Sequence, residues 1–124
     1  MATIAIDFDG TVVTHEYPKV GRDIGAVPVL KKLVENGHHL ILFTMRSPKA
    51  HLEDAIKWFY DKQIPLYSIN TNPTQLRWTT SPKALAELYI DDAALGIPLC
   101  YPDGERPYVN WIEVEKMLKE KGII

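Results

Sequence analysis

The 124-residue sequence lacks several features that would restrict where the protein works. It has one cysteine, Cys100, so the chain cannot form an internal disulfide, and this suits a reducing compartment. No apolar run is long enough to span a bilayer, and the N-terminus has no basic stretch of the signal-peptide kind. We therefore expect a cytoplasmic protein with no membrane partner.

An excess of basic residues is also missing. The chain has 14 Lys and Arg residues against 16 Asp and Glu residues, which gives a formal net charge of −2. Domains that bind nucleic acid usually carry a basic face, so nucleic acid is not the favoured partner. The length and the hydrophobic fraction of 46% indicate one globular domain over residues 1–124.

Short apolar runs alternate with amphipathic stretches along the chain. Strands are expected over residues 3–8, 39–43, 66–69 and 85–90, with a fifth over 97–101. Helices are expected over residues 26–36, from a cap at Ser47 to Lys62, and from Asn110 to Lys121. This alternation predicts an α/β fold, a three-layer Rossmann-like open parallel sheet of four to five strands flanked by helices.

Two irregular segments interrupt this pattern. Residues 11–25 contain Pro18, Gly21 and Gly25, and we expect them to form a short flap. A small hairpin within the flap would pair residues 12–14 with residues 20–22. Residues 70–82 are rich in Asn, Thr and Pro, and are expected to form a loop.

Carboxylates follow the expected strands at their carboxyl ends. Asp7 and Asp9 end the first strand, and Asp91 and Asp92 follow the fourth. Parallel strands with right-handed crossovers bring these ends to one edge of the sheet, where ligands bind. Close carboxylates repel one another, and a divalent cation relieves the repulsion. Oxygen ligands favour a hard ion, so the sequence predicts a Mg²⁺ site at these four residues.

The same residues indicate a reaction. Asp7 can attack a phosphoryl group and form an aspartyl-phosphate, while Asp9 can transfer protons to the leaving oxygen and from water. Thr44, at the end of the second strand, can offer its hydroxyl and neighbouring amides to a phosphate. Lys83 can neutralise the nucleophile and the transferring group. Each residue alone has a commoner structural explanation as a turn, a cap or a solvated charge, but the ordered combination is specific.

These motifs resemble those of the haloacid dehalogenase (HAD) superfamily over essentially the whole chain. Residues 7–11 (Asp-Phe-Asp-Gly-Thr) are similar to its first motif, residues 42–44 to its second, Lys83 to its third and residues 89–92 to its fourth. Most members are Mg²⁺-dependent phosphatases that work through an aspartyl-phosphate. More narrowly, the chain looks like a group of compact HAD hydrolases from bacteria and phages.

The resemblance implies a role for each motif residue. Asp7 would be the nucleophile and a metal ligand, and Asp9 the acid/base residue that also offers its backbone carbonyl to the metal. Asp91 would be a ligand, and Asp92 a ligand directly or through water. An Asp at position 9 favours a phosphatase over a dehalogenase. Lys83 stands closer to Asp91 than in many relatives, and Lys49 is the alternative.

The gaps between motifs are too short for the cap domain that larger relatives insert. Specificity would then come from short loops, a partner subunit or a large substrate. The expected substrate-binding residues are Gly10, Thr11, Met45 and Arg46, with His15, Tyr17, Arg22, Asn70, Asn72 and Arg77 as further candidates. Arg46 is the best of them, because its guanidinium can fork to a phosphate.

The sequence thus predicts a Mg²⁺-dependent phosphatase that acts on a phosphorylated small molecule. A phosphatase for a macromolecular end, either a nucleic-acid 3′-phosphate or a phosphoprotein, is the first alternative. A non-catalytic phosphate-binding module of the same fold is the second. Trp78 or Trp111, if exposed, would mark the interface of a homo-oligomer.

Overall fold

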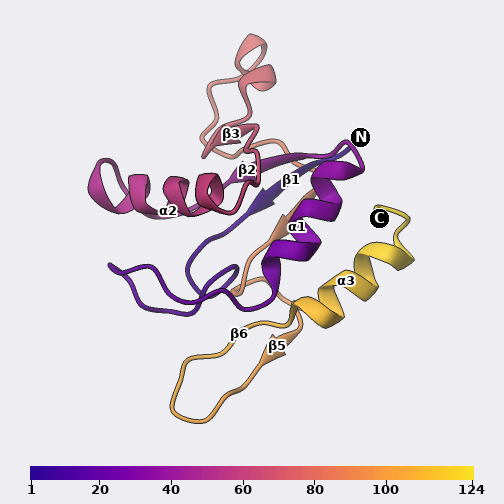
Figure 1. Cartoon of the computed structure of the whole chain (residues 1–124). Helices are drawn as coiled ribbons and strands as arrows, with labels where there is room; N and C mark the ends of the chain where they lie inside the picture. Colours follow the sequence, from indigo (N-terminus) through magenta and orange to yellow (C-terminus); the bar gives the residue numbers. More distant parts are fainter.

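A computed structural model describes all residues, 1–124, and is built on one parallel sheet. Its strands are β1 (Thr3–Ile6), β2 (His39–Leu42), β3 (Ser68–Ile69) and β4 (Leu88–Ile90), in the order β3-β2-β1-β4 (Figure 1). The predicted α/β fold with an open parallel sheet is confirmed, with four strands in that sheet. Because β1 lies between β2 and β4, the residues that follow it emerge between the ends of two neighbouring strands.

Three helices flank the sheet, namely α1 (Ala26–Glu35), α2 (Ala50–Asp61) and α3 (Trp111–Glu120). Each turns an apolar stripe inward. An ion pair between Lys32 and Glu115 joins α1 to α3, and the two helices lie side by side in Figure 1. No helix has the length and apolar character needed to cross a membrane.

The core explains why the first strand reads as continuously apolar. All four residues of β1 are buried, as in a parallel strand that is covered on both faces. Phe8 continues into the core, where its ring lies 5.9 Å from that of Trp58 and 6.2 Å from that of Phe59, both on α2. Because Phe8 points into the core, Asp7 and Asp9 on either side of it can both lie at the edge of the sheet.

Three predicted elements begin later than expected, and one of them is the strand expected over residues 66–69, which begins at Ser68. The helix expected from Ser47 begins at Ala50, with Lys49 as its N-cap residue and no side-chain cap. The strand expected from residue 85 begins at Leu88. The side chain of Gln75 explains the late start of β4. Its amide group bonds to the backbone of residues 83 and 85 and holds them away from the sheet. Gln75 itself lies in a 3-10 helix, η1 (Pro73–Arg77), within the predicted loop.

The expected fifth strand of the main sheet is wrong. Residues Leu99–Cys100 form β5, which pairs antiparallel with β6 (Tyr108–Val109) in a separate two-stranded sheet. Residues 99–109, which we call the β5–β6 arm, project from the body of the molecule (Figure 1). The arm matters for the site because the Val109 N–H donates to the Gly10 carbonyl at 3.1 Å.

The flap, residues 11–25, has little regular structure. Val13 forms isolated bridges with Asp9 and Asp23, and the Thr14 N–H donates to the Arg22 carbonyl at 3.0 Å. The expected hairpin therefore exists only as these contacts, shifted toward residue 23. Of the two tryptophans considered for an interface, Trp111 is buried and Trp78 is 67% exposed.

Candidate active site

Backbone hydrogen bonds extend the sheet by one residue beyond its strands, and this places the motif residues. The Asp7 N–H donates to the Ile90 carbonyl at 3.0 Å, and the Phe43 N–H donates to the Ile6 carbonyl at 2.8 Å. Asp7 is thereby fixed next to Asp91, the residue that follows Ile90. Continued strand pairing brings acids 84 residues apart in the sequence to one sheet edge.

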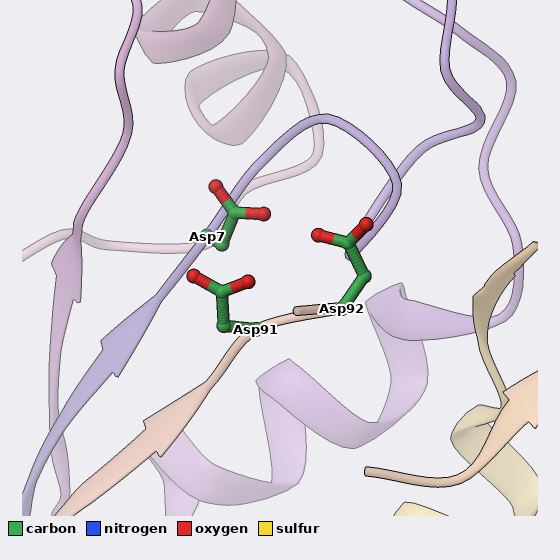
Figure 2. Close-up of side chains that lie close together, drawn as sticks. All are labelled: Asp7, Asp91 and Asp92. Carbon is green, nitrogen blue, oxygen red and sulfur yellow. The ribbon is translucent and has the colours of Figure 1, made fainter. Parts of the chain in front are cut away.

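Three carboxylates converge at this edge, from Asp7, Asp91 and Asp92. Figure 2 shows their side chains around one space, with Asp7 at the end of β1 and the other two after β4. Each offers an oxygen, and these oxygens lie within 4.8 Å of one another. We call these three residues the Asp triad. Of the four carboxylates predicted to meet at this edge, the structure brings together these three.

Thr11 connects two members of the triad, Asp7 and Asp92. Its hydroxyl lies 2.8 Å from Asp7 Oδ2, to which it donates, and 3.3 Å from Asp92 Oδ1. The Asp92 N–H donates to the same hydroxyl oxygen at 3.0 Å. Thr11 is completely buried, so its hydroxyl positions these two carboxylates rather than contacting a substrate as we expected.

Partial burial and the two neighbouring acids oppose the ionisation of Asp7. The pKa of Asp7 is raised to about 8, first by burial and then by the neighbouring carboxyls of Asp92 and Asp91, against the lowering effect of the Thr11 hydroxyl. In the metal-free protein Asp7 therefore retains its proton well above the ordinary range of a carboxyl. Such a group becomes a good nucleophile only when positive charge stands beside it.

The triad suits a metal ion in both charge and donor type. Three oxygens within 4.8 Å can close on one cation, and an oxygen-only donor set suits a hard divalent ion. A cation would also allow all three carboxyls to ionise together, which their mutual repulsion opposes in its absence. The triad could thus hold a metal ion.

Asp9 belongs to a different arrangement. Arg46 Nε donates to Asp9 Oδ2 at 2.8 Å, and Arg46 Nη2 donates to Asp9 Oδ1 at 2.7 Å. This bidentate ion pair is short and well shielded, since the side chain of Arg46 is 1% exposed. The carboxylate of Asp9 is therefore not part of the triad. The role that the resemblance gives to its backbone carbonyl stays a prediction.

Arg46 differs from our expectation of a phosphate-binding fork. Its remaining N–H groups donate to the carbonyls of Pro18 and Lys19 in the flap and of His51 in α2, at 2.8–3.1 Å. The rings of Phe8 and Tyr17 lie 5.0 and 5.1 Å from its guanidinium carbon. All five N–H donors are thus satisfied inside the protein, so Arg46 holds Asp9, the flap and α2 together.

A pocket of about 550 Å³ opens in front of these groups. Its lining comprises Asp7, Asp9, His15, Tyr17, Thr44, Met45, Arg46, Asp91, Asp92, Ala93 and Arg106. We call it the carboxylate pocket. The predicted residues Thr44 and Met45 therefore do line it, and the Met45 side chain is 99% exposed at its rim. The Thr44 N–H donates to Asn70 Oδ1 at 2.8 Å, which leaves the Thr44 hydroxyl as its free donor.

A glycine is needed at position 10 because the His15 side chain fills the space that a Cβ would occupy. The φ of Gly10 is +78°, and a Cβ there would overlap the imidazole ring of His15. His15 Nε2 lies 3.1 Å from Asp92 Oδ2, so the ring packs over Gly10 to reach the triad. Gly10 does not line the pocket, in contrast to its expected role in substrate binding.

Several predicted residues lie elsewhere. Lys83 lines a separate hollow beside Trp78 and Tyr89, and no ion pair or hydrogen bond joins its ammonium to the triad. Lys49 is the N-cap residue of α2 and does not line the carboxylate pocket. The further candidates Arg22, Asn70, Asn72 and Arg77 are also outside the pocket lining. The position of Lys83 gives no support to its predicted catalytic role.

Sequence reasoning missed two contributions to the pocket. Arg106, in the β5–β6 arm, lines the pocket, yet it sits in a turn-rich stretch with no motif around it. The Arg46–Asp9 pair joins residues 37 apart, and nothing in the local sequence of either residue indicates the other. His15 was a candidate, but its contact with Asp92 was not foreseen.

Comparison with known proteins gives one informative relationship. No family model matches the chain, and no curated protein matches it. A solved structure of a conserved protein from Bacteroides thetaiotaomicron is 36% identical, with a TM-score of 0.79. The alignment covers 97% of this chain and 91% of that one, and the description of that protein names no activity. The chain belongs to the same family as this conserved bacterial protein.

Proposed function

We propose that this protein is a Mg²⁺-dependent phosphatase that hydrolyses a small phosphate monoester through an aspartyl-phosphate on Asp7. The observation that carries the proposal is the Asp triad in a solvent-open pocket, with the separate carboxylate of Asp9 in the same lining. One acid is thus available for attack and another for proton transfer. The resemblance of residues 7–11 and 89–92 to HAD motifs supports the same assignment.

In the first half-reaction an Asp7 oxygen attacks phosphorus, the ester P–O bond breaks, and the leaving oxygen takes a proton from Asp9. In the second, Asp9 removes a proton from water, whose oxygen attacks the aspartyl-phosphate and releases inorganic phosphate and Asp7. When bound, the cation supplies positive charge that offsets the triad and the phosphoryl oxygens.

The Arg46–Asp9 ion pair directly suits one of the two proton transfers in this cycle, the transfer from water to Asp9. Paired with Arg46, Asp9 is a carboxylate, the form that accepts a proton from water. Each carboxylate oxygen keeps a lone pair after bidentate pairing. The opposite transfer, from Asp9 to the leaving oxygen, requires that Asp9 carry the proton before the ester bond breaks.

The openness of the pocket favours a second candidate function, a phosphatase for a macromolecular end. Met45 stands almost fully exposed at the rim, and no cap covers the triad. A large phosphorylated partner would itself exclude water from such a site. The net charge of −2 favours a phosphoprotein over a nucleic-acid end.

A screen of phosphate esters with Mg²⁺ tests the proposal, with Asp7→Asn as the matched inactive variant. We expect phosphate release that EDTA stops and that Asp7→Asn reduces by about three orders of magnitude or more. Activity that survives in Asp7→Asn would remove Asp7 as the nucleophile. A wild-type protein that turns over no ester, small or macromolecular, would favour the non-catalytic module.

A further inference from the structure

We propose that Arg106, at the tip of the β5–β6 arm, binds the phosphoryl oxygens of the substrate in the carboxylate pocket. This inference rests on the proposed function, and it names the residue that supplies the positive charge for substrate binding. It follows from the charges of the pocket, the anchoring of the arm and the position of Arg106.

The charges of the pocket leave a phosphate with few partners. Asp7, Asp9, Asp91 and Asp92 all line it, so an anionic ester meets four acidic side chains. The lining has two arginines, and Arg46 is committed through all of its N–H groups to protein acceptors. Lys83 lies in another hollow. Arg106 is therefore the one arginine of the lining whose donors are free for a ligand, because it makes no hydrogen bond or ion pair within the protein.

The arm that carries Arg106 is fastened to the catalytic loop at its base. The Val109 N–H donates to the Gly10 carbonyl at 3.1 Å, and Trp111 Nε1 donates to the Thr11 carbonyl at 2.7 Å. Both acceptors belong to the loop that follows Asp7 and Asp9. The arm is thus held in a fixed position relative to Asp7, although the two are far apart in the sequence.

The tip of the arm is fastened a second time, to the flap. Both guanidinium Nη atoms of Arg22 donate to the carboxylate of Glu105, at 2.7 and 2.8 Å. Glu105 immediately precedes Arg106, so this bidentate pair limits where Arg106 can move. Arg106 is itself exposed, but the arm is held at its base and at its tip, so the backbone that carries Arg106 beside the pocket is restrained.

Arg106 also borders a second, smaller hollow of about 210 Å³, lined by Thr14, His15, Glu16, Gly104, Glu105 and Arg106. Only Arg106 and His15 line both spaces. Of the two, His15 is engaged with Asp92. A planar guanidinium at this boundary suits two of the three equatorial oxygens of a phosphoryl group, which it can bind side by side.

Calorimetric titration with inorganic phosphate in saturating Mg²⁺ tests the inference without measuring turnover. We expect Arg106→Ala to weaken phosphate binding by about 10- to 100-fold, the usual value of hydrogen bonds to a charged group. Arg106→Lys should recover part of the loss, because it restores the charge but not the fork. Glu105→Gln, which releases the tip of the arm, should weaken binding by about two- to fivefold.

Arg77→Ala is the matched control, since Arg77 is an exposed arginine outside the pocket, and it should bind phosphate as the wild type does. The melting temperature of Arg106→Ala should equal that of the wild type. Wild-type affinity in Arg106→Ala, a larger loss in Lys83→Ala, or a wild-type protein that binds no phosphate would each overturn the inference. Failure of ester hydrolysis, with phosphate affinity still dependent on Arg106, would instead refute the phosphatase alone.

Discussion

Arg46 and Asp9 form a two-point ion pair in which both carboxylate oxygens accept from one guanidinium, at 2.7 and 2.8 Å. The same guanidinium bonds to the flap and to α2, so the pair is a junction of three segments. Arg46, which sequence reasoning assigns to substrate binding, thus holds in place Asp9, the residue proposed to transfer protons.

Replacing Arg46 should cost stability. Arg46→Ala leaves a shielded carboxylate and three backbone carbonyls without their donor, and we expect a loss of about 3 kcal/mol or more in urea unfolding. Arg46→Lys should recover little, because an ammonium has three donors where the site uses five. Arg77→Ala, at an exposed position, should change stability by less than about 0.5 kcal/mol. A mild Arg46→Ala variant would contradict the fastening role.

The stability of the metal-free protein should depend on Asp7 in a direction opposite to that of most acids. The pKa of Asp7 is raised from 3.8 to about 8 by burial and then by Asp92, so between these values the folded state binds the extra proton. Stability therefore falls as pH rises through this window. Asp7→Asn should remove that part of the pH dependence in thermal melts with EDTA. A wild-type profile unchanged by the substitution would be evidence against the buried proton.

Magnesium should oppose the loss of stability that the metal-free protein shows as pH rises. On the proposed function Mg²⁺ binds the ionised triad and displaces the Asp7 proton, so the rise in melting temperature with Mg²⁺ should be larger at pH 8 than at pH 5.5. At a concentration 100 times its Kd the ion adds about 2.7 kcal/mol to the free energy of unfolding. Asp91→Asn should lose most of this shift, whereas Asp54→Asn, on the exposed side of α2, should keep it. An equal shift in both variants would place the ion elsewhere.

Gly10 and His15 should show strong energetic coupling. Gly37→Ala has a similar φ of +83° with open space around it, so it measures the backbone penalty alone, about 1–2 kcal/mol. Gly10→Ala should cost more than this, because its methyl group meets the His15 ring. Removing the ring in the double variant Gly10→Ala, His15→Ala should return part of the loss. Additive effects in this cycle would show that the ring moves aside freely.

The sheet edge was the most predictable part of this protein. Asp7 and Asp91 could be brought together from sequence because apolar runs reveal parallel strands, and parallel strands share a carboxyl edge. The position of Lys83 was not predictable in the same way. It depends on the side chain of Gln75, which bonds to the backbone of residues 83 and 85 and shortens the fourth strand.

Two other features lay beyond sequence reasoning for different physical reasons. Strands β5 and β6 have two residues each, too few for a period-two pattern to appear. The local sequence around Arg46 does not indicate whether its guanidinium binds phosphate or forms an internal ion pair. The partner decides this, and Asp9 lies 37 residues away. The contact between Arg22 and Glu105 spans 83 residues and has no local signal either.

The hydrogen bond from Trp111 Nε1 to the Thr11 carbonyl joins residues 100 apart in the sequence, and it limits the order in which parts of the site can form. Asp7 is synthesised 104 residues before Trp111, whose side chain secures the loop that follows Asp7. That loop therefore cannot be secured until Trp111 has been synthesised and α3 has packed against it. Trp111 fluorescence should report this packing step.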